Sequence, residues 1–434
     1  MNSIRLVLAV VVAKVYVTEQ MDADTAFLNS DLKEEVYMEV PNGIKNAEKM
    51  MCKLDKAIYG LKQAASAWNK TIHAVFLQIG FQSSGADQCV YVKVNNGSFV
   101  YVCLYVDDMI IAAKTSREIQ EVKKALKNSF KMKELGEVKF ILGMEIDHDR
   151  NDSTLMIRQT RYIDDVVCRF NQDEAKAVVN PCESGLKLSK IQSPATDAEI
   201  EEMQSKPYRS LIGCMLYITT CTRPDVAYII TQLSRFLENP GQQHWKASIR
   251  VLRYLKTTRD YGIIYDGSAS EVQATAYTDA DWGSNIDDRR SVSGIMVMIG
   301  GAPVVFKSKY QRTVALSSAE AEYMALSFCT QEVLWVRAML KDLGHEQVGA
   351  TLVYEDNQGA IGLASNSGYN ARTKHVDIRH HFIRENVAQD IIVVKYKSTV
   401  DQLADMLTKA LGTKRLKYLL QASGIGPRRS QHKR

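Results

Sequence analysis

The segment from Val100 to Ala113 constrains the fold more than any other part of the chain. Two apolar runs of strand character flank Asp107 and Asp108, which places two adjacent carboxylates at the tip of a predicted hairpin. Such tips normally carry Asn-Gly or Asp-Gly, and neighbouring like charges repel unless a cation lies between them. Carboxylates that hold two divalent ions about 3.5–4 Å apart are typical of enzymes that displace phosphoryl groups. An exposed acidic turn is the alternative, and the dipeptide alone does not decide between the two.

A third carboxylate, Asp22, follows another predicted strand. Residues Val15 to Met21 have strand character, and the chain turns away directly after Asp22. Acids at the ends of neighbouring strands can share one metal site, so this residue strengthens the metal hypothesis for the first part of the chain.

Pattern and composition predict an α/β multidomain protein. Of the 434 residues, 46 % are hydrophobic and 24 % are charged, as in ordinary globular proteins. Residues 1–150 alternate short strands and helices, and residues 151–265 are mostly helical. Residues 271–411 follow the order three strands, helix, strand, helix, strand, helix, which predicts a domain with a mixed five-stranded sheet. Residues 412–434 have no periodicity and form a basic tail that accounts for the net charge of +5.

The chain lacks the signals of a membrane or secreted protein. No run approaches the ~18 apolar residues needed to span a bilayer. The eight cysteines include no CxxC pair, so neither a zinc site nor a disulfide framework is indicated. We therefore expect no membrane partner, no secretion, and a reducing compartment.

A second set of acids lies in the C-terminal half. Each member follows a predicted strand or belongs to a predicted helix: Asp279, Glu322, Asp356 and Asp405. One acid alone is more often a surface residue than a ligand, but four of them are expected at one edge of the strand-helix-strand array. Carboxylates without His or Cys favour Mg²⁺ or Mn²⁺ over zinc.

The N-terminal half resembles the reverse transcriptase of copia-type LTR retrotransposons. The resemblance rests on motifs in that family's order and spacing: Gln20–Asn29, Ile58–Ala64, Tyr105–Asp108 and Leu135–Ile146. It implies a polymerase palm in which the catalytic, metal-binding residues are Asp22, Asp107 and Asp108. It also implies that nucleotide or primer is bound by Gln63, Tyr105, Gly143 and Met144. For Gln63 the alternative is a glutamine on a helix surface.

The C-terminal half resembles the RNase H domain of the same elements. Its motifs are Tyr277–Gly283, Ala315–Leu326, Glu355–Ile361, Lys374–Glu385 and Leu403–Lys409. By this resemblance two Mg²⁺ or Mn²⁺ bind at the catalytic residues Asp279, Glu322, Asp356 and Asp405, with Glu322 preferred over Glu320. One ion would activate water and the other would stabilise the leaving 3′ oxygen.

Basic and aromatic residues add expectations about nucleic acid. We expect Arg372, Lys374 and Arg379 to face the nucleic-acid backbone, with a merely solvated helix face as the alternative. The tryptophans Trp245, Trp282 and Trp335 are expected to be core anchors rather than stacking platforms.

The family pattern also has departures. Only 21 residues precede Asp22, and the arginine that usually precedes Trp68 is absent. We therefore expect a Pol fragment with a truncated reverse-transcriptase palm at 1–150, a helical thumb and connection at 151–265, an RNase H-like domain at 271–411, and doubtful polymerase activity. Lys397 to Thr399 stands where the RNase H fold often has a histidine.

The resulting functional expectation is cleavage of the RNA strand of RNA/DNA hybrids by two-metal hydrolysis, with hybrids recognised by shape and by the 2′-hydroxyl. The expected partners are the hybrid, a template-primer and a complementing Pol protein. The expected location is cytoplasmic, in a virus-like particle, or nuclear. The alternative is a catalytically inactive nucleic-acid-binding remnant of a transposable element.

Overall fold

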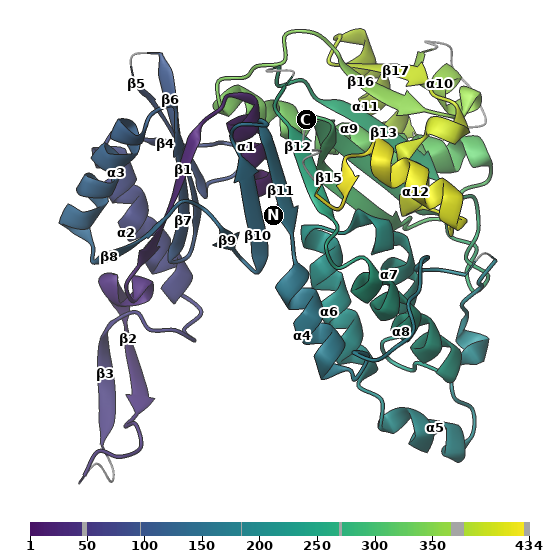
Figure 1. Ribbon diagram of the computed structural model, residues 1–434, viewed down its shortest axis with the longest axis horizontal. Helices are drawn as coiled ribbons and strands as arrows, with labels where there is room; N and C mark the ends of the chain where they lie inside the picture. Colours follow the sequence, from purple (N-terminus) through teal and green to yellow (C-terminus); the bar gives the residue numbers. More distant parts are fainter. Residues whose placement is uncertain (46–49, 96, 184, 269–270, 366–376, 429–434) are drawn as a thin grey trace. The chain divides into compact units, whose positions relative to one another are not determined.

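The computed structural model describes the 434 residues except 46–49, 96, 184, 269–270, 366–376 and 429–434 (Figure 1). The described residues form two compact units. One unit contains residues 15–138 with 342–344, and the other contains 1–14, 139–341 and 345–434. The division into 1–150, 151–265, 271–411 and 412–434 stays a prediction.

The unit containing residues 15–138 is built on a six-stranded antiparallel sheet in the order β4-β5-β6-β7-β1-β8. In chain order its strands are β1 (Val17–Ala23), β4 (Gln82–Ser83), β5 (Val90–Asn95), β6 (Ser98–Tyr105), β7 (Asp108–Ala113) and β8 (Met132–Gly136). A two-stranded ribbon, β2 (Asp31–Glu39) with β3 (Met51–Lys56), follows the short 3₁₀ helix Ala26–Asn29.

Helices α2 (Ala64–Gln78) and α3 (Ser116–Ser129) pack on this sheet (Figure 1). The predicted apolar face of α3 is buried in the same core as Trp68 and Phe76 of α2. A complete capping box between Thr115 and Glu118 determines where α3 begins, since it satisfies backbone donors of the first turn.

The other unit contains two five-stranded sheets. The first is antiparallel in the order β18-β12-β11-β10-β9, and its strands are β9 (Phe140–Ile141), β10 (Met144–Asp149), β11 (Thr154–Arg158), β12 (Gly262–Asp266) and β18 (Ile425–Gly426). The second has the order β15-β14-β13-β16-β17, and its strands are β13 (Thr275–Ala280), β14 (Val292–Ile299), β15 (Ala302–Tyr310), β16 (Thr351–Glu355) and β17 (Ile392–Tyr396).

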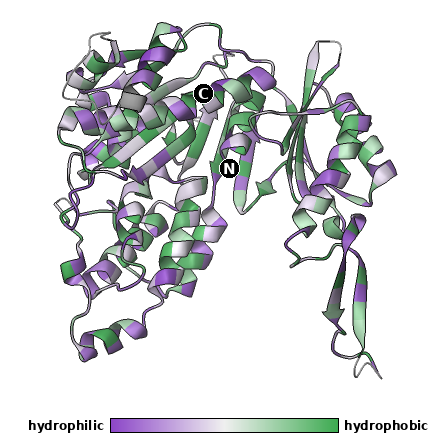
Figure 2. Cartoon of the chain, turned by 180° about the vertical axis from the view of Figure 1, so that it is seen from behind, coloured by the Kyte–Doolittle hydropathy of each residue, from purple (hydrophilic) through white to green (hydrophobic). Residues whose placement is uncertain are grey.

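The second sheet confirms the predicted mixed topology. Strand β13 pairs antiparallel with β14 and parallel with β16, while β14–β15 is antiparallel and β16–β17 is parallel. The Gly300-Gly301 turn joins β14 to β15 as expected, with both glycines at positive φ. Figure 2 shows hydrophobic residues concentrated in the strands, in agreement with the fully buried β14.

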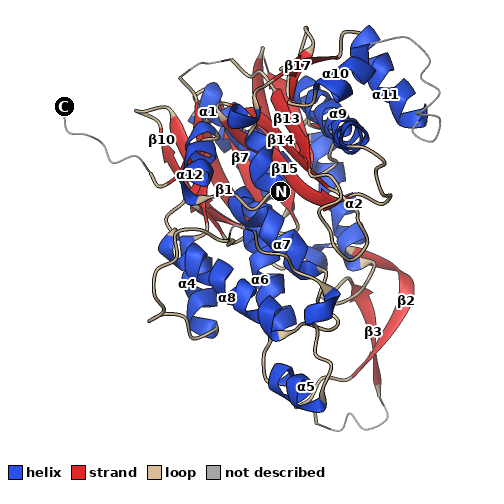
Figure 3. Ribbon diagram, turned by 90° about the vertical axis from the view of Figure 1, so that its right-hand side faces the viewer, coloured by secondary structure: helices blue, strands red, loops and turns tan. Residues whose placement is uncertain are grey.

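Apart from α1 (Asn2–Ala13), the α-helices of this unit fall into two groups. The first contains α4 (Thr160–Arg169), α5 (Asp197–Gln204), α6 (Tyr208–Cys221), α7 (Ala227–Ser234) and α8 (Gln242–Thr257), of which α6, α7 and α8 lie side by side (Figure 3). The second begins after β15 and contains α9 (Ser318–Asp342), α10 (Gln358–Ser365), α11 (Asp377–Ala388), α12 (Thr413–Ala422) and the 3₁₀ helix η6 (Leu403–Leu407).

Each end of the described chain contains a helix. Residues Asn2–Ala13 form helix α1, which packs on β11, β12 and β15. The expectation that residues from 412 lack periodic structure is wrong, because α12 buries Leu416, Leu419 and Leu420 and is followed by β18. No helix among the described residues is both long and apolar enough to cross a membrane.

Candidate functional site

The mixed sheet brings acids together at one edge. Because β13 and β16 run parallel, their carboxyl ends lie at the same edge, and these ends carry Asp279 and Glu355. Asp356 follows β16 directly. Asp279 lies within β13, one residue before its end, rather than after the strand as expected.

Helix α9 adds Glu322 to this edge. Asp279, Glu322 and Asp356 each offer one carboxylate oxygen, and these three oxygens lie within 4.8 Å of one another. In the part of the chain that the structure describes, no other group of three or more potential ligands is this close. Glu320 is directed elsewhere, since its carboxylate accepts a 2.8 Å hydrogen bond from the N–H of Leu316, two residues before α9.

Burial makes this cluster electrostatically costly without a cation. Asp279 is fully buried and Glu322 is 6 % exposed. Burial raises the pKa of Asp279 to about 6, while the ammonium of Lys409 opposes this shift. Burial also raises the pKa of Glu322 well above its usual range, and the nearby charge of Glu355 adds to the effect.

Asp405 is linked to the cluster by Lys409, which contacts both Asp405 and Asp279. It lies in the 3₁₀ helix η6 and not in an α-helix as predicted. Lys409 Nζ is 3.0 Å from Asp405 Oδ1 and 3.1 Å from Asp279 Oδ1. Arg415 contacts the second oxygen of Asp405 at 3.2 Å. Asp405 is therefore held by two cations, and the structure does not group its oxygens with those of the three close acids.

Hydroxyl groups orient two of the acids. Thr408 donates a hydrogen bond to Asp279 Oδ2, and Thr399 donates one of 2.6 Å to Asp356 Oδ2. Among the described residues, Glu322 Oε2 and Glu355 Oε2 are buried without any hydrogen-bond partner.

Glu355 is the residue that sequence reasoning missed. It is fully buried, and one of its oxygens accepts the Asn357 N–H at 3.0 Å. Its position directly before Asp356, at the end of a predicted strand, was the available signal. The potential metal ligands at this edge are all carboxylate oxygens, and some of them are buried without a hydrogen-bond partner. Such ligands fit Mg²⁺ or Mn²⁺.

The unit built on the six-stranded sheet holds the other predicted acids. Asp22 of β1 lies directly opposite Asp108 of β7, and Asp107 occupies the turn between β6 and β7. Burial, followed by the Asp107 charge, raises the pKa of Asp22. Burial also raises the pKa of Asp108, although a hydrogen bond from Gln20 opposes the shift. The three acids thus influence one another, in a looser arrangement than the Asp279 cluster.

The predicted hairpin tip has unusual geometry. Val106, the first turn residue, has φ of 56°, which is unfavourable for a β-branched side chain. Trp68 holds this turn by donating a 2.6 Å hydrogen bond to the Val106 carbonyl. Tyr59, which sequence reasoning also missed, donates a 3.3 Å hydrogen bond to Asp107 and packs its ring against Phe27.

The predicted nucleotide- and primer-binding residues fall in both units. Gln63 is the residue before α2, and Tyr105 is exposed beside the acidic turn. Gly143 and Met144 belong to the unit with the two five-stranded sheets, where Met144 is fully buried in β10. A primer contact at Met144 would therefore have to involve its backbone.

The remaining predictions concern basic and aromatic residues. Arg372 and Lys374 lie outside the described residues, and the side chain of Arg379 in α11 is not described either. The expectation that Trp282 is a core anchor is wrong, because its side chain is 59 % exposed and donates only to the Ala315 carbonyl. It lies two residues after the end of β13.

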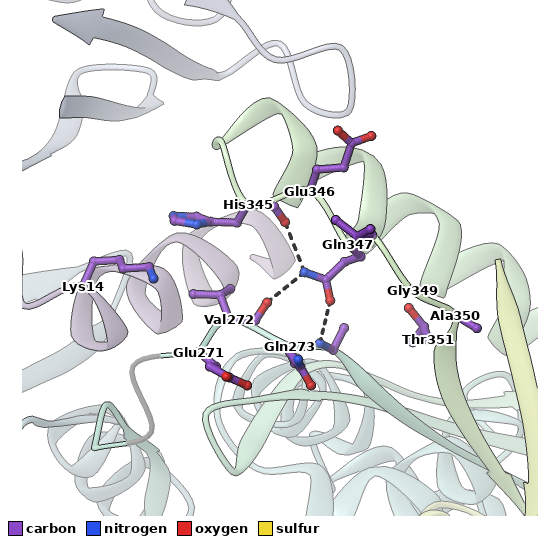
Figure 4. Close-up of a pocket in the computed structure, with 12 residues that line it drawn as sticks. Lys14, Glu271, Val272, Gln273, His345, Glu346, Gln347, Gly349, Ala350 and Thr351 are labelled. Carbon is purple, nitrogen blue, oxygen red and sulfur yellow. Dashed lines mark hydrogen bonds between the residues drawn. The ribbon is translucent and has the colours of Figure 1, made fainter. Parts of the chain in front are cut away.

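A separate cavity of about 520 Å³ lies at the opposite end of the sheet (Figure 4). It adjoins Ala274 before β13 and Thr351 at the start of β16, the amino ends of the strands whose carboxyl ends carry the acids. The side chain of Gln347 donates a hydrogen bond to the Val272 carbonyl and accepts one from the Ala274 N–H. None of the clustered acids lines this cavity.

Comparisons with known proteins place these sites in context. Residues 1–184 match the family described as reverse transcriptase (RNA-dependent DNA polymerase). The chain is 41 % identical over 428 residues to the retrovirus-related Pol polyprotein from transposon TNT 1-94 of Nicotiana tabacum, covering 98 % of this chain and 32 % of the relative. The Pol polyprotein from transposon RE2 of Arabidopsis thaliana is 36 % identical, with coverages of 94 % and 28 %.

A shorter relative is matched along its whole length. The putative transposon Ty5-1 protein of Saccharomyces cerevisiae is 33 % identical over 317 residues, which cover 72 % of this chain and 100 % of that protein. Among solved structures, a foamy viral protease-reverse transcriptase in complex with RNA/DNA hybrid has a TM-score of 0.43 and 12 % identity, covering 88 % of this chain and 44 % of its own. The chain thus spans about a third or less of the length of its plant relatives.

Proposed function

We propose that this chain, which belongs to the Pol polyprotein family of copia-type LTR retrotransposons, hydrolyses the RNA strand of RNA/DNA hybrids. The observation that carries the proposal is the convergence of Asp279, Glu322 and Asp356 within 4.8 Å at the carboxyl edge of the mixed sheet. Strand ends of this kind, with buried acids and unpaired carboxylate oxygens, support a phosphodiesterase that uses divalent metal ions.

In this mechanism Asp279, Glu322 and Asp356 would hold two Mg²⁺ or Mn²⁺. When bound, the ions would supply an activated water and stabilise the leaving 3′ oxygen. Thr408 and Thr399 orient Asp279 and Asp356 by hydrogen bonds. Asp405 would join these ligands in place of its contact with Lys409, and Glu355 is a further buried carboxyl group directly before Asp356.

The experiment is Mg²⁺-dependent cleavage of a labelled RNA/DNA hybrid by the full chain. Glu322→Gln should abolish cleavage, whereas Glu320→Gln, a matched change two residues away on the same helix, should leave most of it. Asp279→Asn and Asp356→Asn should each remove most activity. Equal loss in both glutamate variants, or cleavage that persists in EDTA, would contradict the assignment.

A second candidate activity is RNA-directed DNA synthesis at Asp22, Asp107 and Asp108. It is supported by the family match over residues 1–184 and by the cross-strand pairing of Asp22 with Asp108. Its proposed partner is a template-primer, and its test is primer extension that is lost in Asp107→Asn. An inactive nucleic-acid-binding remnant would bind the hybrid but show neither reaction. The complementing Pol protein and the cytoplasmic or nuclear location stay predictions.

A further inference from the structure

Lys409 holds the position between two of the acids that are proposed to bind metal. Its ammonium lies 3.1 Å from Asp279 Oδ1 and 3.0 Å from Asp405 Oδ1. The backbone favours this arrangement, because the Lys409 N–H donates to the Asp405 carbonyl at 3.1 Å and places both side chains on one turn. A divalent ion shared by these two oxygens would need the place of the ammonium, and like charges this close repel. The lysine and such an ion therefore exclude each other.

The three close acids do not share this restriction. One oxygen each of Asp279, Glu322 and Asp356 lie within 4.8 Å of one another. Among the described residues, the ion pairs at this edge all involve Asp279 or Asp405. A first ion can therefore bind at the three close acids while Lys409 keeps its contact with Asp405. An ion that is also held by Asp405 requires the ammonium to leave.

A small cavity gives Lys409 a second place to go. It has a volume of about 250 Å³, and its lining includes Thr408 and Lys409 together with residues 284–286 and residues of α7. The only acid in the described lining is Asp281. The Lys409 side chain is 37 % exposed, so packing does not fix it in its present position.

Asp281 is a buried acid that the proposed mechanism does not use. It is 7 % exposed, and its two oxygens accept hydrogen bonds from the Ser284 hydroxyl and the Val292 N–H. Both donors are neutral, and a carboxylate oxygen accepts more than one hydrogen bond. Arg235, a neighbouring cation in the lining, is already paired with Asp287 at 2.6 Å. Asp281 can therefore accept an ammonium that moves into the cavity.

We propose that Lys409 is an exchangeable cation, which neutralises Asp279 and Asp405 in the metal-free chain and turns into the cavity toward Asp281 when a divalent ion takes its place. This inference rests on the proposed function, since it concerns the acids of the proposed ribonuclease site. It makes the binding of a second ion depend on where the lysine lies. Coupling between sites typically changes an affinity by about 5- to 150-fold.

The test is a titration of the full chain with Mn²⁺ in the absence of nucleic acid, followed by electron paramagnetic resonance, which counts the bound ions. The wild type should bind one ion more tightly than a second. Lys409→Met should tighten binding of the second ion about tenfold, because no ammonium has to be displaced, and should change the first ion less. Lys409→Arg keeps the positive charge, and Lys417→Met removes a charge from an exposed position on α12, so both should leave the second ion weak.

Asp281→Asn separates the exchange from simple charge repulsion. It removes the acceptor of the displaced ammonium, so it should weaken binding of the second Mn²⁺ about fivefold in the wild type and leave it unchanged in the Lys409→Met background. Asp288→Asn removes an exposed acid that is paired with Arg290, and it should have no effect in either background.

Two results would overturn the inference: an equally tight second ion in the wild type and in Lys409→Met, or equal weakening by Asp281→Asn in both backgrounds. The proposed hydrolysis is judged separately by cleavage of the hybrid. Coupled Mn²⁺ binding without cleavage would leave the exchange standing and defeat the hydrolytic function. Cleavage without coupling would do the reverse.

Discussion

The Lys409 ammonium lies 3.1 Å from Asp279 Oδ1, at the edge of the sheet where three acids converge. The same ammonium contacts Asp405, so a single cation partly neutralises two buried carboxylates. The acids of Asp279 and Asp405 raise the pKa of Lys409 despite its burial. Lys409 thereby stabilises the cluster in the absence of a divalent ion.

Replacement of Lys409 tests this role. Lys409→Met should lower the free energy of unfolding by about 2 kcal/mol in EDTA, because it leaves the buried Asp279 carboxylate without its cationic partner. Mg²⁺ should then raise the Tm of the variant more than that of the wild type, since binding to the folded state restores positive charge. Thermal unfolding with and without Mg²⁺ measures both effects. Lys395→Met, at an exposed site on β17, is the control, and an identical Mg²⁺ shift in Lys409→Met and wild type would contradict the prediction.

His244 predicts a pH dependence of stability. Its Nδ1 accepts a 2.9 Å hydrogen bond from the Gly241 N–H, its ring stacks on Phe236, and burial lowers its pKa to about 4. Between pH 6.5 and 4 the unfolded chain therefore binds a proton that the folded chain does not. The stability contribution of neutral His244 is complete above pH 6.5 and is lost as the pH falls, by up to about 3 kcal/mol.

The measurement for His244 compares Tm values at pH 7.5, 5.5 and 4.5 for wild type and His244→Gln. The variant should lose less stability than the wild type on acidification, because glutamine does not titrate. Parallel Tm curves for the two proteins would show that His244 does not cause the acid sensitivity.

Arg223 and Asp225 form a buried ion pair, and we expect its disruption to lower the free energy of unfolding strongly. Their side chains are both 0 % exposed, their closest oxygen and nitrogen are 2.7 Å apart, and the Tyr254 hydroxyl donates to Asp225 as well. Asp225→Asn should lower the free energy of unfolding by about 3–5 kcal/mol, because it leaves the Arg223 guanidinium buried without its counter-ion. Urea unfolding should show this loss.

The control for that pair is Asp164→Asn, which removes an exposed partner of Arg259 and should cost less than about 1 kcal/mol. A similar small cost for Asp225→Asn would show that water or another acid compensates Arg223.

Val106 predicts a stabilising substitution. Its φ of 56° lies in the left-handed region, where a β-branched residue is strained. Val106→Asn should raise the free energy of unfolding by about 1 kcal/mol, because asparagine tolerates this conformation. Calorimetry of the full chain measures the change, and a loss of more than about 1 kcal/mol would mean that Val106 packing outweighs its strain.

Local pattern alone determined a large part of this fold. Three predictions used only short stretches of sequence: the strands on either side of Asp107, the apolar face of α3 and the Gly300-Gly301 turn. The structure confirms each of them. The same signals placed Asp279, Glu322 and Asp356 at strand ends and a helix start. The parallel pairing of β13 and β16 brings Asp279 and Asp356 to the same edge of the sheet, and α9 adds Glu322 there.

Only the tertiary structure decided which distant groups meet. Lys409 and Asp279 are 130 positions apart, and no local periodicity encodes their contact. Arg5 finds its acceptors at Thr220 and Val304, which draws α1 onto β15 although α1 is followed directly by a segment of the other unit. Such pairings depend on the burial of apolar surface over the whole unit. Hydrophobic burial is not directional, so the sequence shows which faces will be covered but not by which partner.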